Sequence, residues 1–138
     1  VITNVVDQGD GTDGVLNDAD NVDWTASTTL GGRRYSGGLI FVNEDEDNGE
    51  VWQINPDGSD PVRVARANAG SGTSGIFDLS NLVGYRPASI LICSNKGAPS
   101  SMSVLINPNA ELLAPSTPPP TPIPTSLPPN PQPIQIPT

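Results

Sequence analysis

Proline is distributed unevenly along this chain, and its distribution limits what each part can fold into. The chain has 138 residues and 16 prolines, and 11 of these prolines fall between positions 114 and 138. Proline fixes φ and has no backbone N–H, so this arm is excluded from helices and from central strands. Its natural conformation is polyproline II, which at about 3.1 Å per residue would extend the arm to on the order of 75 Å. We therefore expect a folded body that carries an extended arm.

The chain before the arm has the sequence pattern of short β-strands. Polar and apolar residues alternate over 50–55 and 61–66, and residues 39–43 form an apolar run. The acidic segment between residues 39–43 and residues 50–55 ends in Asn48-Gly49, a pair suited to a tight turn. We expect these three segments to form an antiparallel meander. Further strands are expected at 1–6, 88–94, 101–107 and 110–113.

Other segments lack a strand pattern. Residues 7–23 are rich in Asp, Gly and Asn and are predicted to be an acidic loop, and residues 70–75 a flexible loop. Residues 76–85 are expected to hold one helical turn, because Asp78 and Ser80 can cap it. The predicted fold class is all-β: a small antiparallel, sandwich-like domain at 24–113. It is preceded by the strand and acidic loop of 1–23 and followed by the arm of 114–138.

The net charge excludes several classes of partner. The chain carries 15 acidic and 6 basic residues, a formal net charge of -9. An acidic protein repels phosphate backbones and anionic lipid headgroups, so we expect neither nucleic acid nor a membrane surface as partner. No stretch approaches the roughly 20 apolar residues that span a bilayer, so we also expect no membrane insertion.

The residues that carry most catalytic chemistry are missing from the sequence. There is no histidine and only one cysteine, Cys93. This excludes Ser-His-Asp and Cys-His nucleophiles, the usual zinc sites and an internal disulfide. Cys93 follows an apolar run, so we expect a small buried side chain. We identify no catalytic residues and predict that the chain is not an enzyme.

The first residue, Val1, is not an initiator methionine, and no basic segment with an apolar stretch follows it. We interpret it as the processed start of a secreted protein, the alternative being a shortened chain. The expected location is therefore extracellular, at or near the cell surface.

Two acidic segments are candidates for calcium binding. Asp7, Asp10 and Asp13 are interleaved with glycine, as in a calcium loop, but lack the terminal Glu of an EF-hand. Glu44 and Asp45 begin a run of four carboxylates whose mutual repulsion a bound cation would relieve. In both places the alternative is a solvated acidic segment that favours solubility. Ca²⁺ is the one cofactor that the sequence suggests.

Two weaker binding candidates lie in the body. Arg33 and Arg34 could bind an anion, although pairing with the abundant carboxylates is the expected alternative. Trp24 and Trp52 could stack on a sugar, although their alternating contexts favour placement in the core or partly in the core.

The body also resembles a known family. The resemblance rests on residues 41–45, 49–54, 75–79 and 90–92, which resemble the closing blades of PhoX-like, phytase-like phosphatases. These are secreted bacterial β-propellers that bind calcium through acidic residues, and the resemblance places Glu44 and Asp45 in that role. It implies a propeller-blade-like sheet over about 38–108. The chain has too few strands for a propeller, so the activity of the family is not carried over.

The arm has the composition of a glycosylated stalk. Serine and threonine are interleaved with proline at Ser116, Thr117, Thr121, Thr125 and Ser126. This composition is typical of O-glycosylation, and covalent glycans are expected here. The alternative is a disordered linker.

The arm also contains spaced apolar residues, at Ile123, Leu127, Ile134 and Ile136. The last two alternate within residues 133–137, a pattern that suits an edge strand docking in an acceptor groove of a neighbouring copy. Residues 1–6 could serve the same purpose. Repeated without closure, such contacts form a filament.

Three hypotheses follow. The favoured one is an extracellular structural protein, a subunit of a self-assembling filament or surface appendage with an O-glycosylated docking arm. The second is a C-terminal fragment of a calcium-dependent PhoX-like phosphatase. The third is a secreted calcium- or carbohydrate-binding module on a stalk.

Overall fold

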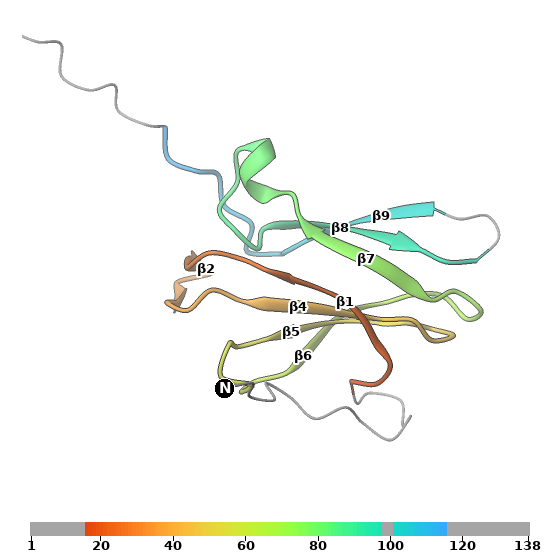
Figure 1. Ribbon diagram of the computed structural model, residues 1–138. Helices are drawn as coiled ribbons and strands as arrows, with labels where there is room; N and C mark the ends of the chain where they lie inside the picture. The colour runs from red at the N-terminus through yellow and green to blue at the C-terminus, as the bar shows by residue number, and fades with distance from the viewer. Residues whose placement is uncertain (1–15, 98–100, 116–138) are drawn as a thin grey trace, which may run out of the picture.

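The described part of the chain folds into antiparallel β-sheets (Figure 1). The computed structural model describes residues 16–97 and 101–115. The elements in chain order are β1 (Ala19–Trp24), β2 (Thr28–Leu30), β3 (Arg33–Tyr35), β4 (Ile40–Glu44), β5 (Glu50–Ile54), β6 (Val62–Arg66), β7 (Thr73–Asp78), the 3₁₀ turn η1 (Ser80–Val83), β8 (Ile90–Asn95) and β9 (Ser101–Ile106). The all-β prediction is confirmed for these residues. The strand expected at 1–6 and the arm beyond Pro115 lie outside them.

The strands form two main sheets and one small hairpin. The four-stranded sheet has the order β1-β4-β5-β6, the three-stranded sheet has the order β7-β8-β9, and β2 pairs with β3. All pairs are antiparallel. The predicted meander corresponds to β4, β5 and β6 and is confirmed. Each strand within it is joined to the next by a short turn, so neighbours in sequence are also neighbours in the sheet.

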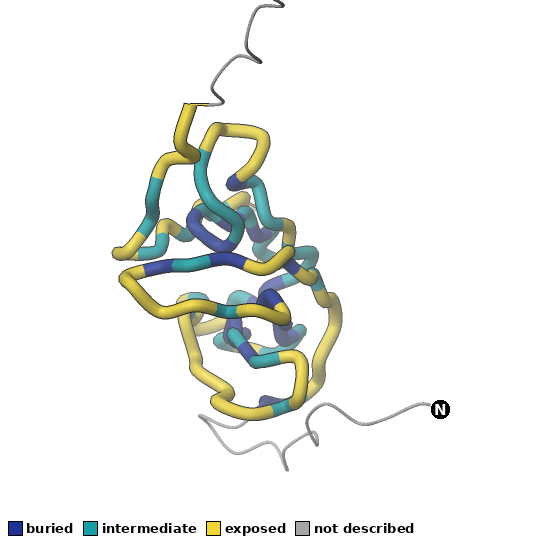
Figure 2. Tube along the Cα trace, turned by 90° about the vertical axis from the view of Figure 1, so that its left-hand side faces the viewer, coloured by how far each residue is buried: buried dark blue, intermediate teal, exposed yellow. Residues whose placement is uncertain are grey.

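The two main sheets face each other across a shared core. Phe41 of β4 packs with Leu91 of β8, and Ile76 of β7 and Leu105 of β9 pack against the same cluster. Buried positions gather between the sheets, while the loops are exposed (Figure 2). Cys93 is buried on this side, as predicted, and burial raises the pKa of its thiol. Alternate residues of each strand thus supply one core.

A second apolar cluster lies on the other face of the four-stranded sheet. Val42 and Trp52 are cross-strand partners there, as are Ile40 and Ile54. Leu16 packs with them, and Trp52 and Ile54 are only 6% and 1% exposed. The central strands β4 and β5 are therefore buried on both faces, which explains the apolar run in β4.

Two strands formed where a loop was predicted. Residues 19–23, expected within the acidic loop, belong to β1, and β7 begins at Thr73, inside the predicted flexible loop. Most side chains of β1 point into solvent, so its aspartates are tolerated on an edge strand that pairs with β4. In β7 the register shifts around Gly75, whose φ of 64° marks a bulge. In both cases backbone pairing outweighed local propensity.

The β2–β3 hairpin was not expected from the sequence. Its turn is Gly31-Gly32, with φ of 56° and 78°, the pattern of a type I′ turn. This glycine pair between two short runs was the available signal.

The expected helical turn is confirmed as η1. An oxygen of Asp78 accepts a hydrogen bond from the Ser80 N–H at 3.0 Å, and its other oxygen accepts one from the Ala88 N–H at 2.8 Å. The turn ends at Gly84, which has a φ of 82°. No helix in the described ranges has the length and hydropathy needed to cross a membrane.

The strand expected at 110–113 is reduced to a single bridge between Tyr85 and Leu112. The Leu113 N–H also donates to the Gly84 carbonyl at 2.9 Å. The arm therefore leaves the body from a point held beside η1.

Candidate functional site

The outer face of the three-stranded sheet is apolar and exposed. Strand pairing aligns Phe77, Ile92 and Val104 in one row across the sheet and Ile90 with Ile106 in another. Val104 and Ile106 are 56% and 69% exposed. We call this surface the open apolar face, and its members are Phe77, Ile90, Ile92, Met102, Val104 and Ile106. A contiguous exposed apolar surface on a soluble protein marks an interaction site.

Strand β9 also presents a free edge, since it lies at the end of the sheet order and, within residues 16–97 and 101–115, pairs only with β8. The Asn107 N–H donates to the Ser89 carbonyl at 2.9 Å, so the backbone groups of Asn107 point toward β8. Backbone groups alternate in direction along a strand, so the N–H and C=O of Leu105 also point toward β8. The backbone groups of Met102, Val104 and Ile106 therefore point away from β8, toward the free edge. These three residues are the ones whose side chains lie on the open apolar face.

A groove runs between β9 and the edge strand β6 of the other sheet. Its volume is about 260 Å³, and Val64 contributes to its wall from β6. Phe41, Leu91, Leu105, Ile106 and Pro108 also line it. The sandwich is therefore open along the side where β9 has its free edge. On the opposite side β1 and β7 lie against each other.

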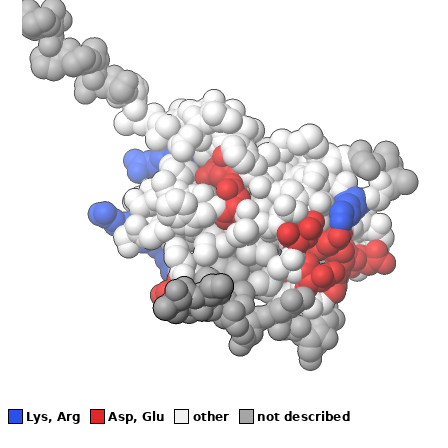
Figure 3. Space-filling model, in the orientation of Figure 1, with Lys and Arg blue, Asp and Glu red and all other residues white. Residues whose placement is uncertain are grey.

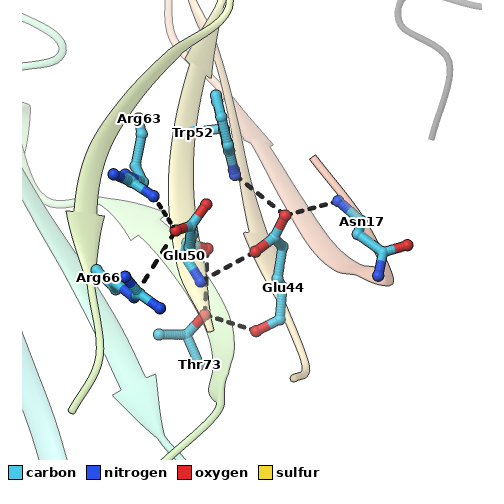
Figure 4. A network of polar contacts seen from close by, with 7 residues as sticks. All are labelled: Asn17, Glu44, Glu50, Trp52, Arg63, Arg66 and Thr73. Atoms are coloured by element: carbon cyan, nitrogen blue, oxygen red, sulfur yellow. Dashed lines mark hydrogen bonds and ion pairs between the residues drawn. The ribbon is translucent and has the colours of Figure 1, made fainter. Parts of the chain in front are cut away.

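The first calcium candidate in the described residues, Glu44, is buried and accepts hydrogen bonds (Figure 4). Its carboxylate accepts from the Asn17 N–H at 2.6 Å, the Glu50 N–H at 3.2 Å and the Trp52 Nε1–H at 3.1 Å. Burial raises the pKa of Glu44, the donors lower it, and the charge of Glu50 raises it further. Three protein donors thus occupy the positions at which a cation would bind.

Glu50 lies opposite Glu44 on the same face of the sheet and is paired with arginine. One oxygen forms an ion pair with Arg63 and lies 3.8 Å from Nε of Arg66 (Figure 4). The Thr73 hydroxyl donates to the Glu44 carbonyl at 2.8 Å. This network joins β4, β5, β6 and β7 at one end of the molecule, and its chemistry is that of a structural clamp.

The second described calcium candidate, Asp45, points to a different partner. It forms an ion pair with Lys96, and this contact is the main cause of the raised pKa of Lys96. In Figure 3 a basic patch adjoins an acidic patch at this end of the molecule. Glu44 and Asp45 are therefore not brought together at one site. No group of three His, Cys, Asp or Glu side chains in residues 16–97 and 101–115 could hold a metal ion.

Arg33 and Arg34, for which anion binding was one possibility and pairing with carboxylates the expected alternative, lie in two different environments. Arg33 forms an ion pair with Asp60 at 2.8 Å and stacks over Tyr35. Arg34 has no ion-pair partner among the described residues. It lines a hollow of about 330 Å³ with Tyr35, Pro56 and Asp57.

The two tryptophans differ in exposure. Trp52 is buried, as its alternating context predicted, and cannot stack on a sugar. Trp24 is 61% exposed, so its predicted core placement was wrong. It lies on the edge strand β1, and its Nε1–H donates to the Gly37 carbonyl at 3.1 Å.

Several predicted site residues lie outside the described residues. They are the calcium candidates Asp7, Asp10 and Asp13, the O-glycosylation candidates Ser116, Thr117, Thr121, Thr125 and Ser126, and the docking candidates Ile123, Leu127, Ile134 and Ile136. The calcium, glycosylation and docking assignments stay predictions.

Comparison of the chain with protein-family models, with curated proteins and with solved structures gave no match. The open apolar face was missed from the sequence, because an apolar run such as 104–106 does not show which of its two sides is covered.

Proposed function

We propose that the chain is an extracellular structural protein, a subunit of a self-assembling filament or surface appendage. The open apolar face carries this proposal. The outer face of a sheet in a monomeric sandwich is usually polar, with alternating side chains turned to water. Here the outward residues of β8 and β9 include Ile90, Ile92, Val104 and Ile106. Covering them with a neighbouring subunit would remove apolar surface from water, which favours association.

The arm supplies a connection between subunits. It starts from a point fixed to the body by the Leu113 hydrogen bond and carries no charge. Polyproline II loses little conformational entropy on docking, because it is already extended. O-glycans on its Ser and Thr residues would keep the connecting part in solvent. The proposal assigns the chain no catalytic activity.

Electron microscopy of the full chain and of a variant ending after Leu113 tests this proposal. The full chain is expected to form long uniform fibres, whereas the shortened variant should remain dispersed. Circular dichroism should be the same for both, because the body retains its sheets. Fibres formed equally well by the shortened variant would refute the role of the arm.

A second candidate function is supported by Arg34. The Arg34 guanidinium, which has no ion-pair partner in the described ranges and lines a hollow, suits pairing with the carboxylate of an acidic sugar. A stalked binding module would use this site. Calorimetric titration with an acidic oligosaccharide should give saturable binding that Arg34→Gln abolishes, whereas no heat of binding would refute this function.

A further inference from the structure

The end of the arm has a pattern that lets it pair as a strand on one edge only. From 130 to 137 the sequence is Asn-Pro-Gln-Pro-Ile-Gln-Ile-Pro, so every even position has a backbone N–H and the odd positions 131, 133 and 137 do not. In an extended strand the N–H and C=O of alternate residues point to the same side. One edge of this segment therefore has all its donors, while the other retains only that of Gln135.

The free edge of strand β9 has backbone N–H and C=O groups that could pair with the edge of the arm that keeps its donors. Its free backbone groups belong to Met102, Val104 and Ile106, and the side chains of these residues form the border of the open apolar face. Within the arm, the positions with free donors include Ile134 and Ile136. In an antiparallel pair, residues that exchange both hydrogen bonds lie opposite each other with their side chains on the same face.

We infer that residues 130–137 dock as an antiparallel strand on the free edge of β9 in a second copy of the chain. Ile134 and Ile136 then lie opposite two of the three exposed β9 residues and extend the open apolar face by one strand. The odd prolines face outward and prevent a further strand from pairing there. This inference rests on the proposed function and specifies the donor segment and the acceptor edge.

The properties of the arm favour a second copy over the chain's own β9. No glycine occurs after Gly97, and Pro115 and Pro118–Pro120 follow directly on the body. A stiff segment of this kind is poorly suited to the sharp reversal that self-docking requires. Residues 116–129 in polyproline II would extend about 43 Å. A six-residue strand is about 20 Å long, so an arm in that conformation would reach beyond its own sheet.

Charge gives no obstacle to this contact. Strands β8 and β9 contain no charged residue, and the chain carries none after Glu111. Docking therefore buries no unpaired charge. The contact consists of backbone hydrogen bonds and apolar side chains.

A proline exchange in the full chain tests the direction of pairing. The variant Ile134→Pro/Ile136→Pro removes the two donors that face β9, and Gln135→Pro removes the one that faces outward. We expect the critical concentration for fibres to rise roughly tenfold or more in the first variant and less than about twofold in the second. An equal effect of both variants would overturn the inferred pairing.

The double proline variant loses two isoleucine side chains as well as two backbone donors. Disulfide trapping tests the pairing of the strands directly. Val104→Cys is combined with Ile134→Cys, with Ile136→Cys or, as control, with Gln135→Cys, and fibres are oxidised. Covalent multimers on a non-reducing gel are expected for at least one isoleucine position and not for the control. Cross-linked monomers would show self-docking, and cross-linking only in the control would show the opposite pairing; either overturns the inference. If no variant cross-links while removal of the arm still abolishes fibres, this docking mode is refuted and arm-mediated assembly stands.

Discussion

The two outer faces of the sandwich have similar side chains and different surroundings. On the four-stranded sheet, Val42, Trp52 and Ile54 are buried with Leu16, and the Glu44 network closes one end. On the three-stranded sheet, Val104 and Ile106 remain largely exposed. Buried apolar side chains increase the free energy of unfolding of the monomer, whereas exposed ones remain available for contact with a partner. The outer face of the four-stranded sheet therefore contributes to the stability of the monomer, whereas under the proposed function the open apolar face would be covered on association.

The largest difference in the free energy of unfolding is expected when one isoleucine on each outer face is replaced by alanine. Ile54→Ala removes a side chain that is 1% exposed and should lower the free energy of unfolding by about 3 kcal/mol. Ile106→Ala, on a residue that is 69% exposed, should cost less than about 1 kcal/mol. Urea denaturation of both variants measures the difference. Equal losses would mean that the open apolar face is covered within the monomer.

A smaller effect is expected for the two tryptophans. Trp52→Phe keeps most of the packing but removes the N–H that donates to the buried Glu44 carboxylate, at a cost of about 1–2 kcal/mol. Trp24→Phe removes an exposed hydrogen bond and should cost about 0.5 kcal/mol or less. Thermal unfolding of the two variants tests this order. A reversed order would contradict the structural role assigned to the Glu44 network.

The buried Glu44, on the outer face of the four-stranded sheet, should make the free energy of unfolding depend on pH. Because the pKa of Glu44 is raised in the folded chain, the folded state holds this proton more tightly than the unfolded state does. Its contribution to the free energy of unfolding is therefore greatest below the ordinary pKa and falls as pH rises through the raised pKa. Glu44→Gln should remove this decline, which urea denaturation between pH 4 and 7 would show. A decline that persists in the variant would assign it to another group.

The smallest change in stability is expected on the open apolar face. Val104→Thr keeps a β-branched side chain on an exposed strand and should alter the free energy of unfolding by less than about 0.5 kcal/mol. The same exchange at the buried Val42 should cost more, because it places a hydroxyl against Trp52. Chemical denaturation of the matched pair checks this. Binding of a hydrophobic dye should fall in Val104→Thr and stay unchanged in the other variant.

The strands that could be predicted from the sequence are those whose own side chains have a strand pattern. Strands β4, β5, β6, β8 and β9 have apolar runs or alternation, and the turn at Asn48 has a φ of 70°, as the Asn-Gly pair predicted. Strands β1 and β7 could not be predicted in the same way. An Asp-rich edge and a bulge at Gly75 become strands only because β4 and β8 lie beside them.

The candidate site was less predictable than the fold. The sequence identified Glu44 as acidic and near a turn, but its burial depends on Asn17 and Trp52 approaching from other segments. The open apolar face depends on the sheet order, which leaves β9 without a second neighbour. Such properties come from tertiary arrangement, to which local patterns are blind.

The absence of charge from β8 and β9 has a consequence for ionic strength. Each subunit carries a formal net charge of -9, yet the proposed contact holds none of it. In the proposed filament, neighbouring bodies would therefore repel each other, while the contact made by the arm would carry no side-chain charge. Added salt would screen the repulsion, because the Debye length falls to about 8 Å at physiological ionic strength. It would leave the contact intact, because the contact contains no charged side chain. Such fibres would be firmer in brine than in fresh water, the reverse of an assembly held by ion pairs.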